Sequence, residues 1–262
     1  ELLYNARENF GPAYRRPTEL LYHQVDRFDT LLADLLEISR FDAGSATLDT
    51  APHNLLAVID DVLLEVQPHL VRTGTELNIH TTDQQIMVEM DHRRIERVLR
   101  NLFFNAVEHS EGKPIDVYVA CNQTTVGLTV RDHGVGMKPE HLHQVFNRFW
   151  RADPSRKRTL GGTGLGLSIA AEDVRLHHGV LEAWGRLGEG ASFRLTMPLQ
   201  QSLEMGDSPV LLTGEPESES DGETPDKRYR KGSSQLTYLD HEQDIPELTP
   251  SHERISKKEN DG

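Results

Sequence analysis

The chain has 262 residues, a formal net charge of −14 and one cysteine. The negative charge argues against nucleic acid as a partner, because a nucleic-acid binder needs a basic face, and a single cysteine excludes an internal disulfide. No apolar run approaches the roughly 18 residues needed to cross a bilayer. Since the sequence also begins inside a helical pattern, we interpret it as a soluble fragment whose upstream part is missing.

Residues 1–43 carry the pattern of a partial helical hairpin. After an interruption at residues 8–17, apolar residues recur at alternating spacings of four and three. This seam consists of Leu21, Val25, Phe28, Leu32 and Leu35. We expect so apolar a hairpin to pair with a second copy into four helices. Packing on its own domain is the alternative.

Residues 44–54 are a predicted linker with Gly44 as the helix stop, and residues 55–199 form the main domain. Its expected helices cover residues 55–70, 91–110 and 164–178, and its expected strands cover residues 75–80, 86–90, 115–122, 125–132, 180–185 and 191–198. The two kinds of element mix without regular alternation, and most strands alternate in polarity. This predicts an α+β fold, a two-layer α/β sandwich whose mixed sheet carries helices on one face.

Residues 200–262 are predicted to be an acidic, disordered tail. From residue 201 onward, fifteen acidic residues oppose seven basic ones, which gives a charge of −8. The stretch is rich in Ser, Pro, Gly and Glu, so it cannot bury enough apolar area to offset its chain entropy. The basic island KRYRK, residues 227–231, is either a docking point or a solvated charge run.

Two asparagines stand four residues apart on the expected helix over 91–110. Asn101 and Asn105 share one helix face among apolar neighbours, although asparagine is a mediocre helix former. Neutral amide oxygens can hold Mg²⁺ where phosphates supply the negative charge. Taken by itself, the pair indicates either such a site or hydrogen bonds to a neighbouring loop.

The segment DHGVGM, residues 132–137, places Asp132 at the end of an expected strand. An ionised carboxylate accepts hydrogen bonds from an exocyclic amine, so Asp132 is suited to reading the N6 amino group of adenine. Gly134 and Gly136 in the following turn would let the backbone approach the base closely.

A third motif, GGTGLGL, spaces Gly162, Gly164 and Gly166 two residues apart and runs directly into a helical pattern. Glycine-rich turns that open a helix bind phosphate, because backbone N–H groups and the helix dipole point outward there. No lysine follows, which excludes a P-loop, and Leu167 stands where a dinucleotide fingerprint needs glycine. The three motifs together indicate three elements that serve one nucleotide.

These motifs resemble those of the ATPase domain shared by histidine kinases, gyrase, Hsp90 and MutL, the Bergerat-type ATP-binding fold. NLFFNAVEHS is similar to the N box, DHGVG to the G1 box and GTGLGL to the G2 box. VFNRFWRAD (145–153) resembles the F box of sensor histidine kinases, and LLADLLEISRFDAG (31–44) the end of their dimerisation and phosphotransfer hairpin. The resemblance covers residues 1–199.

The resemblance implies ATP and Mg²⁺ as cofactors and a role for each motif residue. Asn105 takes the place of the metal-coordinating asparagine, with Asn101 in support, and Asp132 that of the adenine reader. The further implied ATP contacts are His109 beside the adenine, Gly134, Gly136, Arg148 and Arg151 of the F box, Lys157 of the lid (153–162), Gly162, Thr163, Gly164, Leu165, Gly166 and Leu167. His109 and the lid cations are equally open to a purely solvated role.

Two positions depart from the family pattern. Many histidine kinases carry a lysine or arginine three residues after the second N-box asparagine, where this chain has Glu108. A phosphate contact there is lost or supplied by the lid. The phosphoacceptor histidine of the family lies on the first hairpin helix, and ELLYNAREN contains none, so we expect it upstream of Glu1. No histidine–metal site is predicted.

The resemblance implies a protein-histidine kinase that passes the γ-phosphoryl of ATP to a histidine and then to an aspartate of a response regulator receiver domain. It also implies a homodimer at the cytoplasmic side of the plasma membrane, anchored only through upstream segments. An ATP-driven clamp of the gyrase type and a degenerate, dimerising scaffold are the alternatives. Mg²⁺-dependent ATP affinity separates kinase from scaffold.

Overall fold

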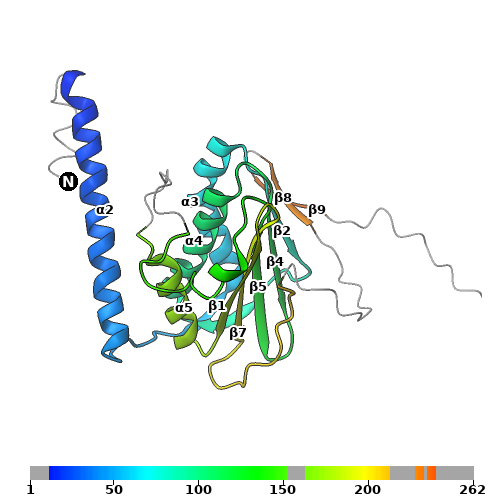
Figure 1. Cartoon of the computed structure of the whole chain (residues 1–262). Helices are drawn as coiled ribbons and strands as arrows, with labels where there is room; N and C mark the ends of the chain where they lie inside the picture. Colours follow the sequence, from blue (N-terminus) through cyan, green and yellow to red (C-terminus); the bar gives the residue numbers. More distant parts are fainter. Residues whose placement is uncertain (1–11, 153–162, 213–227, 233–234, 240–262) are drawn as a thin grey trace, which may run out of the picture.

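The computed structural model describes residues 12–152, 163–212, 228–232 and 235–239 (Figure 1). Its helices are α2 (Pro12–Asp42), α3 (Leu55–Thr73), α4 (His92–His109) and α5 (Gly166–Leu176), with a short 3-10 helix η2 (Pro139–His141). Its strands are β1 (Ala51–Asn54), β2 (Leu77–Thr81), β3 (Met87–Met90), β4 (Ile115–Cys121), β5 (Thr125–Asp132), β6 (Val180–Arg186), β7 (Gly190–Pro198), β8 (Arg228–Gly232) and β9 (Gln235–Leu239). No helix in these ranges is long and apolar enough to span a membrane.

The main sheet has seven strands in the order β6-β7-β5-β4-β2-β8-β9. β2 and β4 run parallel and the other neighbours are antiparallel, so the predicted mixed sheet is confirmed. Helices α3, α4 and α5 lie on one face of this sheet (Figure 1). The core lies between them, where Leu55, Leu99, Phe103 and Phe193 are at most 2% exposed.

Helix α4, which carries the N-box asparagines, begins where the sequence predicts. The carboxylate of Asp91 caps it by accepting from the backbone N–H of Arg94 over 3.2 Å. Its buried face holds Ile95, Leu99 and Phe103. Because this face is turned to the core, the other face of α4 is turned toward the loops before α5.

Helix α2 stands beside the sheet domain and contacts α5 (Figure 1). It begins at Pro12, inside the segment expected to interrupt the helical pattern, and Pro17 lies within it. Pro12 stands at the first helical position, where proline costs no backbone hydrogen bond, and the helix continues through Pro17, so the expected break is wrong over residues 12–17. Gly44 follows the helix with φ of 62°, as the predicted stop. The first hairpin helix falls outside the described residues.

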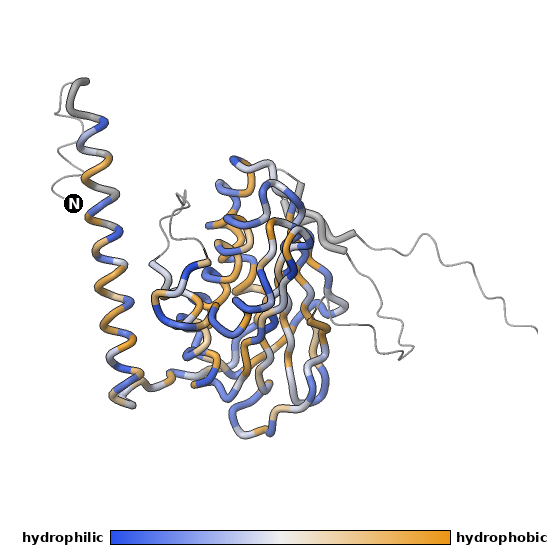
Figure 2. Tube along the Cα trace, in the orientation of Figure 1, coloured by the Kyte–Doolittle hydropathy of each residue, from blue (hydrophilic) through white to orange (hydrophobic). Residues whose placement is uncertain are grey.

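Apolar residues recur along the length of α2 (Figure 2). The five seam residues are 43–65% exposed in the single chain. The C-terminal part of the helix, from Leu31 onward, packs against the sheet domain, and Ile38 and Phe41 are buried there against Leu165 and Ile169. The seam therefore remains available along most of α2.

The predicted linker contains a strand. β1 pairs antiparallel with β3, which places Ala51 opposite Met90 and forms a separate two-stranded sheet. The sequence APHN is too short for an alternation signal and includes a proline, so only the tertiary pairing reveals this strand. The expected linker over 44–54 is thus partly wrong, and β3 does not join the main sheet.

The predicted domain end at residue 199 is too early, because residues 206–212 cross the outer face of the sheet. The hydroxyl of Thr129 donates to Leu211 O over 3.0 Å, and Arg194 Nη1 donates to Val210 O over 3.2 Å. All eight residues of β5 are consequently buried. This segment lacks strand periodicity, so its placement follows from side-chain contacts with the sheet.

Of the rest of the predicted tail, the structure describes the hairpin of β8 and β9. β8 coincides with the basic island and pairs with the free edge of β2, with Ile79 opposite Tyr229. Residues 213–227, 233–234 and 240–262 lie outside the described ranges.

Candidate ATP-binding site

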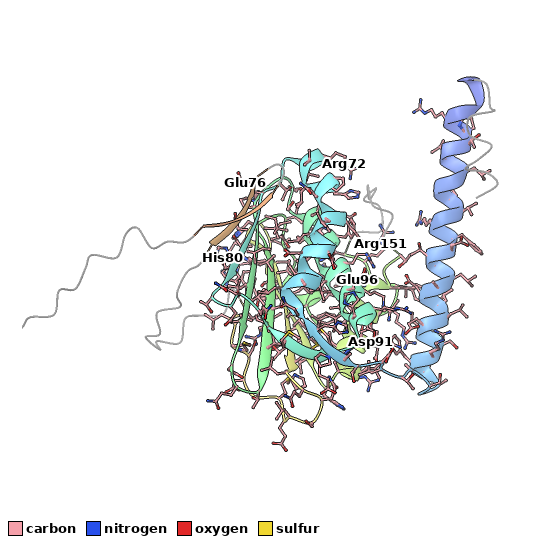
Figure 3. All side chains as sticks on the ribbon, turned by 180° about the vertical axis from the view of Figure 1, so that it is seen from behind. Arg72, Glu76, His80, Asp91, Glu96 and Arg151 are labelled. Carbon is pink, nitrogen blue, oxygen red and sulfur yellow. The ribbon has the colours of Figure 1, made fainter. Side chains whose placement is uncertain are left out.

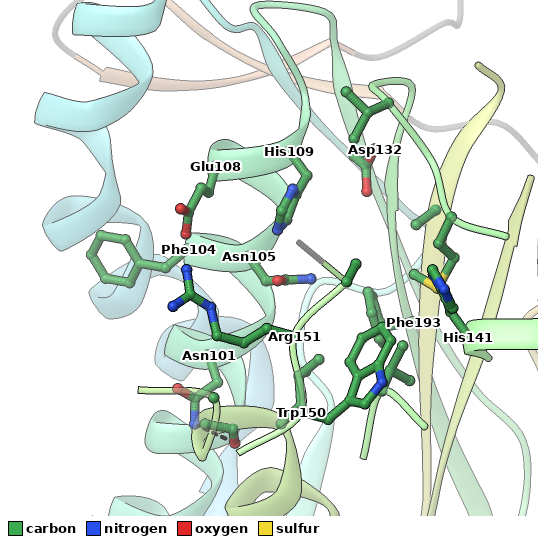
Figure 4. A pocket seen from close by; sticks show the side chains of 18 of the residues that line it. Asn101, Phe104, Asn105, Glu108, His109, Asp132, His141, Trp150, Arg151 and Phe193 are labelled. Atoms are coloured by element: carbon green, nitrogen blue, oxygen red, sulfur yellow. Dashed lines mark hydrogen bonds between the residues drawn. The ribbon is translucent and has the colours of Figure 1, made fainter. Parts of the chain in front are cut away.

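A cavity of about 830 Å³ opens between α4, the loops after β5 and the glycine turn before α5 (Figure 4). Its volume is in the range of small-molecule sites, roughly 300–1,000 Å³. The predicted site residues that line it are Asn101, Asn105, His109, Asp132, Gly136, Arg151, Thr163, Gly164, Gly166 and Leu167. Elements far apart in the sequence therefore converge on one cavity.

Asp132 ends β5 in a closed part of the cavity wall and is 1% exposed. Burial raises the pKa of its carboxyl above the ordinary value, against the opposing hydrogen bonds from the backbone of Gly134 and Ala191 and the charge of Arg131. The bond from Gly134 N to Oδ1 measures 3.0 Å and fixes the carboxylate direction. A buried, directed acceptor of this kind suits an exocyclic amine.

The two N-box asparagines have different surroundings. The side chain of Asn105 points into the cavity (Figure 4). Asn101 Nδ2 instead donates to the carbonyl oxygen of Gly166 over 3.0 Å, which ties α4 to the first turn of α5. Of the two alternatives from the sequence, Asn101 therefore fits the hydrogen bond to a neighbouring loop. Asn105 is the one of the pair whose side chain is directed into the cavity.

Both glycines of DHGVG lie so close to other backbone segments that no side chain would fit. A β-carbon on Gly134 would overlap His109 O at the end of α4, and one on Gly136, whose φ is 65°, would overlap Arg186 O. Both glycines are therefore required by the packing of the protein itself, and the expectation that they also let the backbone approach the base stays a prediction. Gly136 lines the cavity and Gly134 does not.

The turn before α5 is held from three sides. Gly164 O accepts from Phe149 N over 2.9 Å, and Thr163 Oγ1 accepts from Leu165 N over 3.1 Å. Leu165 is fully buried and packs on Ile38 of α2. Leu165 is thus a packing anchor and does not line the cavity. Gly162 and Lys157 lie outside the described residues.

Helix α5 begins at Gly166 without a side-chain cap. Its N-terminal amides and the positive end of its dipole therefore meet the cavity at the glycine turn, an arrangement that favours anions. A β-carbon on Gly166 would come within 2.6 Å of Asn101 Oδ1, so the glycine is needed for the α4–α5 contact as well.

The two F-box arginines, Arg148 and Arg151, occupy different positions relative to the cavity. Arg148 forms a bidentate pair with Asp42 of α2, with distances of 2.8 and 2.6 Å, and it does not line the cavity. The exposed pair with Asp42 thus leaves Arg148 outside the cavity wall, and its expected place near the phosphates is not supported by this structure. Arg151 lines the cavity and lies on the side of the domain that faces α2, away from His80 (Figure 3).

Helix α2 reaches the cavity through acidic residues. Asp34 lines it and accepts from Thr163 Oγ1 over 3.3 Å, and burial raises the pKa of this carboxyl. One turn further, Glu37 accepts from Arg94 Nη1 over 2.6 Å and from Arg97 Nη2 over 3.3 Å. Both arginines also bind Asp173 of α5, which is fully buried.

Sequence reasoning missed the apolar wall of the cavity. Its members include Phe104, Met137, Val145, Trp150 and Phe193. The position of Phe104 was available from helical spacing, since it lies three residues after Asn101 on the same face. Met137, Val145 and Trp150 lie within the quoted segments DHGVGM and VFNRFWRAD, but their apolar side chains were not assigned to the site. Phe193 looks like an ordinary core residue in the sequence, and only the tertiary structure brings it to the cavity.

These residues fit a nucleotide. The apolar wall and the Asp132 acceptor suit a base, and the uncapped end of α5 suits phosphates. The described residues hold no cluster of three His, Cys, Asp or Glu side chains that could bind a metal ion. A hard cation would therefore be held by the phosphates together with the amide oxygen of Asn105.

Comparisons with known proteins agree with this site. Residues 90–201 match the family of histidine kinase-, DNA gyrase B- and HSP90-like ATPases. The chain is 48% identical over 212 residues to the sensor histidine kinase MtrB of Mycobacterium tuberculosis, covering 81% of this chain and 37% of MtrB. The chain thus spans little more than a third of that relative.

Two solved structures share the fold. Full-length ShkA in complex with AMPPNP has a TM-score of 0.66 at 24% identity and covers 79% of this chain and 43% of ShkA. ThkA in complex with the response regulator TrrA has a TM-score of 0.58 at 21% identity and covers 76% of this chain and 56% of that one. With the cavity geometry and the family match, the chain belongs to the sensor histidine kinases and carries their catalytic ATPase domain.

Proposed function

We propose that this chain binds Mg·ATP in the cavity and passes the γ-phosphoryl group to a histidine of the dimerisation hairpin. The phosphoryl group then moves to an aspartate of a response regulator, which by analogy with MtrB is MtrA-like. The observation that carries the proposal is that Asp132, Asn105 and the uncapped N-terminus of α5 converge on one cavity.

Each end of the cavity has a distinct task. The buried Asp132 carboxylate accepts from the adenine amine, and the apolar wall around Phe193 excludes water from the base. The first amides of α5 bind the phosphate oxygens. ShkA, which shares the fold, has been solved with AMPPNP, and this supports an adenine nucleotide as the ligand.

Phosphoryl transfer depends mainly on positioning and on neutralising charge, so the domain needs no nucleophile of its own. Mg²⁺, when bound with the nucleotide, would neutralise charge on the phosphates. Asn105 holds it through a neutral oxygen and adds no repulsion. Asn101 keeps the first turn of α5 in place through Gly166 O.

The partners follow from the same proposal. The exposed seam of α2 pairs with a second copy to complete a four-helix dimer. The receiver domain of the regulator docks on that hairpin, as a regulator is present with ThkA in its solved complex. Membrane attachment belongs to other segments of the whole protein, as expected for an MtrB-like kinase at the cytoplasmic side of the plasma membrane.

Titration calorimetry with ATP, with and without Mg²⁺, tests the nucleotide proposal. We expect Mg²⁺-dependent binding that Asn105→Asp impairs, because a carboxylate beside the phosphates adds repulsion and changes the metal shell. An unchanged Mg²⁺-dependent affinity in that variant would show that Asn105 does not hold the metal. Adenosine affinity serves as the control, since it needs no metal.

Labelling with γ-³²P ATP tests the transfer itself. The first histidine of the sequence is His23, after the expected acceptor position, so we expect ATP binding without self-labelling. Adding a hairpin that contains the first helix should give acid-labile label, because proximity supplies much of the rate. Strong acid-labile label on residues 1–262 alone would show that the acceptor is misplaced.

A further inference from the structure

The nucleotide cavity contains a carboxylate where an anionic ligand would arrive. Glu108 lies on α4, three residues after Asn105, and lines the cavity with its side chain half-buried. Its Oε1 atom is shielded from solvent. A carboxylate in such a place repels a polyphosphate strongly, because the surrounding dielectric is lower than that of water.

The side chain of Arg151 faces the Glu108 carboxylate (Figure 4). The two side chains come from different elements, α4 and the segment before residue 153, and point toward one another across the wall of the cavity (Figure 4). The Nε atom of Arg151 is shielded from solvent as well. Below the guanidinium lies Asn101, which itself binds the glycine turn (Figure 4).

The other two arginines known to line the cavity, Arg97 and Arg100, form ion pairs with carboxylates of the surrounding helices. Arg97 binds Asp173 at 2.7 Å and Glu37 at 3.3 Å. Arg100 binds Glu65 at 2.7 Å and Glu96 at 2.6 Å. Their carboxylate partners lie along α2, α3, α4 and α5, so both guanidinium groups are held by the helices around the cavity.

We infer that Glu108 is a positioning residue that holds Arg151 where the guanidinium meets the phosphates of the nucleotide. The inference rests on the proposed function. Glu108 replaces the basic side chain that the family pattern places on α4, and its charge brings a cation from the neighbouring segment to the same place. A positive charge thus lies where the family pattern has one, although it comes from a different segment of the chain.

The inference predicts effects of opposite sign for one substitution in two backgrounds. Removing a negative charge from an anion site should by itself strengthen ATP binding. If Glu108 orients Arg151, however, Glu108→Gln should weaken ATP binding about tenfold, the loss of one charge-assisted contact. In an Arg151→Gln background only the repulsion remains, so the same substitution should strengthen binding.

The experiment is a double-mutant cycle on the full chain by calorimetry with Mg·ATP and with adenosine. We expect Arg151→Gln to weaken ATP binding by more than Glu108→Gln, because it removes the phosphate contact and leaves the repulsion of Glu108. Neither variant should change adenosine affinity by more than about twofold. Glu204→Gln, an exposed position beyond β7, is the control for the change in net charge. Unchanged adenosine binding also shows that each variant is folded.

The outcomes separate this inference from the proposed function. If the parent chain binds ATP but Glu108→Gln strengthens binding, has no effect, or acts with the same sign in both backgrounds, Glu108 does not position Arg151. If the parent chain binds adenosine and ATP equally, the cavity does not recognise phosphates, and both the proposed function and the inference are overturned.

Discussion

At the scale of single residues, burial shifts the ionisation of one group in the cavity wall and of one group outside it. Asp132 is the clearest case, because burial raises the pKa of its carboxyl while the proposed function needs the ionised form. His177 is the counterpart among the bases, since it is fully buried in the contact between α4 and α5. Each gives a pH dependence of definite sign.

For Asp132, ATP affinity should fall as the pH is lowered toward the raised pKa, because a protonated carboxyl loses an acceptor for the adenine amine. Asp132→Asn should weaken ATP binding at pH 7.5 by about 1.5–3 kcal/mol, the range for a hydrogen bond to a charged group, and should abolish this acid-dependent loss. Calorimetry between pH 5 and 8, on the order of one titration per half unit, measures both. An equal acid-dependent loss in parent and variant would assign it to the nucleotide instead.

For His177, the neutral ring is required. Nε2 accepts from Asp91 N over 3.0 Å, and Nδ1 donates to Asp173 O over 2.7 Å. Burial lowers the pKa of the ring, against the hydrogen bond that Nδ1 donates to Asp173 O and the charges of Asp173 and Asp91. The unfolded chain therefore binds its proton at higher pH, and stability is lost as the pH falls below the unfolded value of about 6.5.

Replacing His177 by Asn should lower the free energy of unfolding at pH 7.5 by about 1–3 kcal/mol, because a buried donor and acceptor lose their partner. It should also flatten the stability profile below about pH 6.5, where the parent ring gains its proton on unfolding. Urea unfolding at several pH values measures this. His178→Asn, at an exposed neighbouring position whose φ of 58° suits asparagine, should leave the profile unchanged.

At the scale of elements, the contact of α2 with the ATPase domain combines a small apolar cluster with a shared ion-pair network. Ile38 and Phe41 pack on Leu165 and Ile169, while Glu37 joins the arginines of α4. The hydrogen bonds from Arg94 and Arg97 lower the pKa of Glu37, against a desolvation that alone would raise it. Docking of α2 thus depends on the charge of Glu37.

Glu37→Gln should weaken the docking of α2 by at least about 1 kcal/mol, because a buried hydrogen-bonded charge pair loses one partner. The ATPase domain should stay folded, since its main core contains no residue of α2. Faster proteolysis within residues 43–50, with an unchanged melting transition of the domain, is the expected measurement. Asp42→Asn, whose pair with Arg148 is exposed, should change proteolysis little.

The sequence predicted elements well wherever periodicity alone carries the signal. The amphipathic α4 with its Asp91 cap and the hairpin of β4 and β5 lie where expected. β1 and the outer segment over 206–212 were missed, because short segments with proline form only through tertiary contacts. In the site, residue types identified Asp132 and Asn105, whereas the carboxylates of α2 that capture Arg148 and Arg97 leave no local pattern.

At the scale of the whole molecule, the exposed seam of α2 predicts self-association. Leu32→Lys should raise the dimer dissociation constant at least about tenfold, because it places a charge in the helical seam without a partner. ATP affinity should stay unchanged, because Leu32 does not line the cavity. Ala33→Lys, one position further on the exposed side of the same helix, is the matched control.

Sedimentation velocity over a range of concentrations measures the dimer. A parent chain that stays monomeric at high concentration would show that the seam of α2 does not pair in these 262 residues. A dimer that tolerates Leu32→Lys but not Ala33→Lys would place the interface on another face of the helix.

The covering of β5 on both sides has a consequence for how long a nucleotide stays. β5 is hydrogen-bonded to β4 and β7 along its whole length, so its amide hydrogens, up to Asp132, exchange only when the domain unfolds. The turn at residues 163–167 is held by Phe149, Asn101 and the end of α2, and its amides exchange through smaller openings. In the proposed function the base contacts the slowly opening wall of the cavity at Asp132, so we expect the residence time of the nucleotide to be set by the faster openings of the turn around its phosphates.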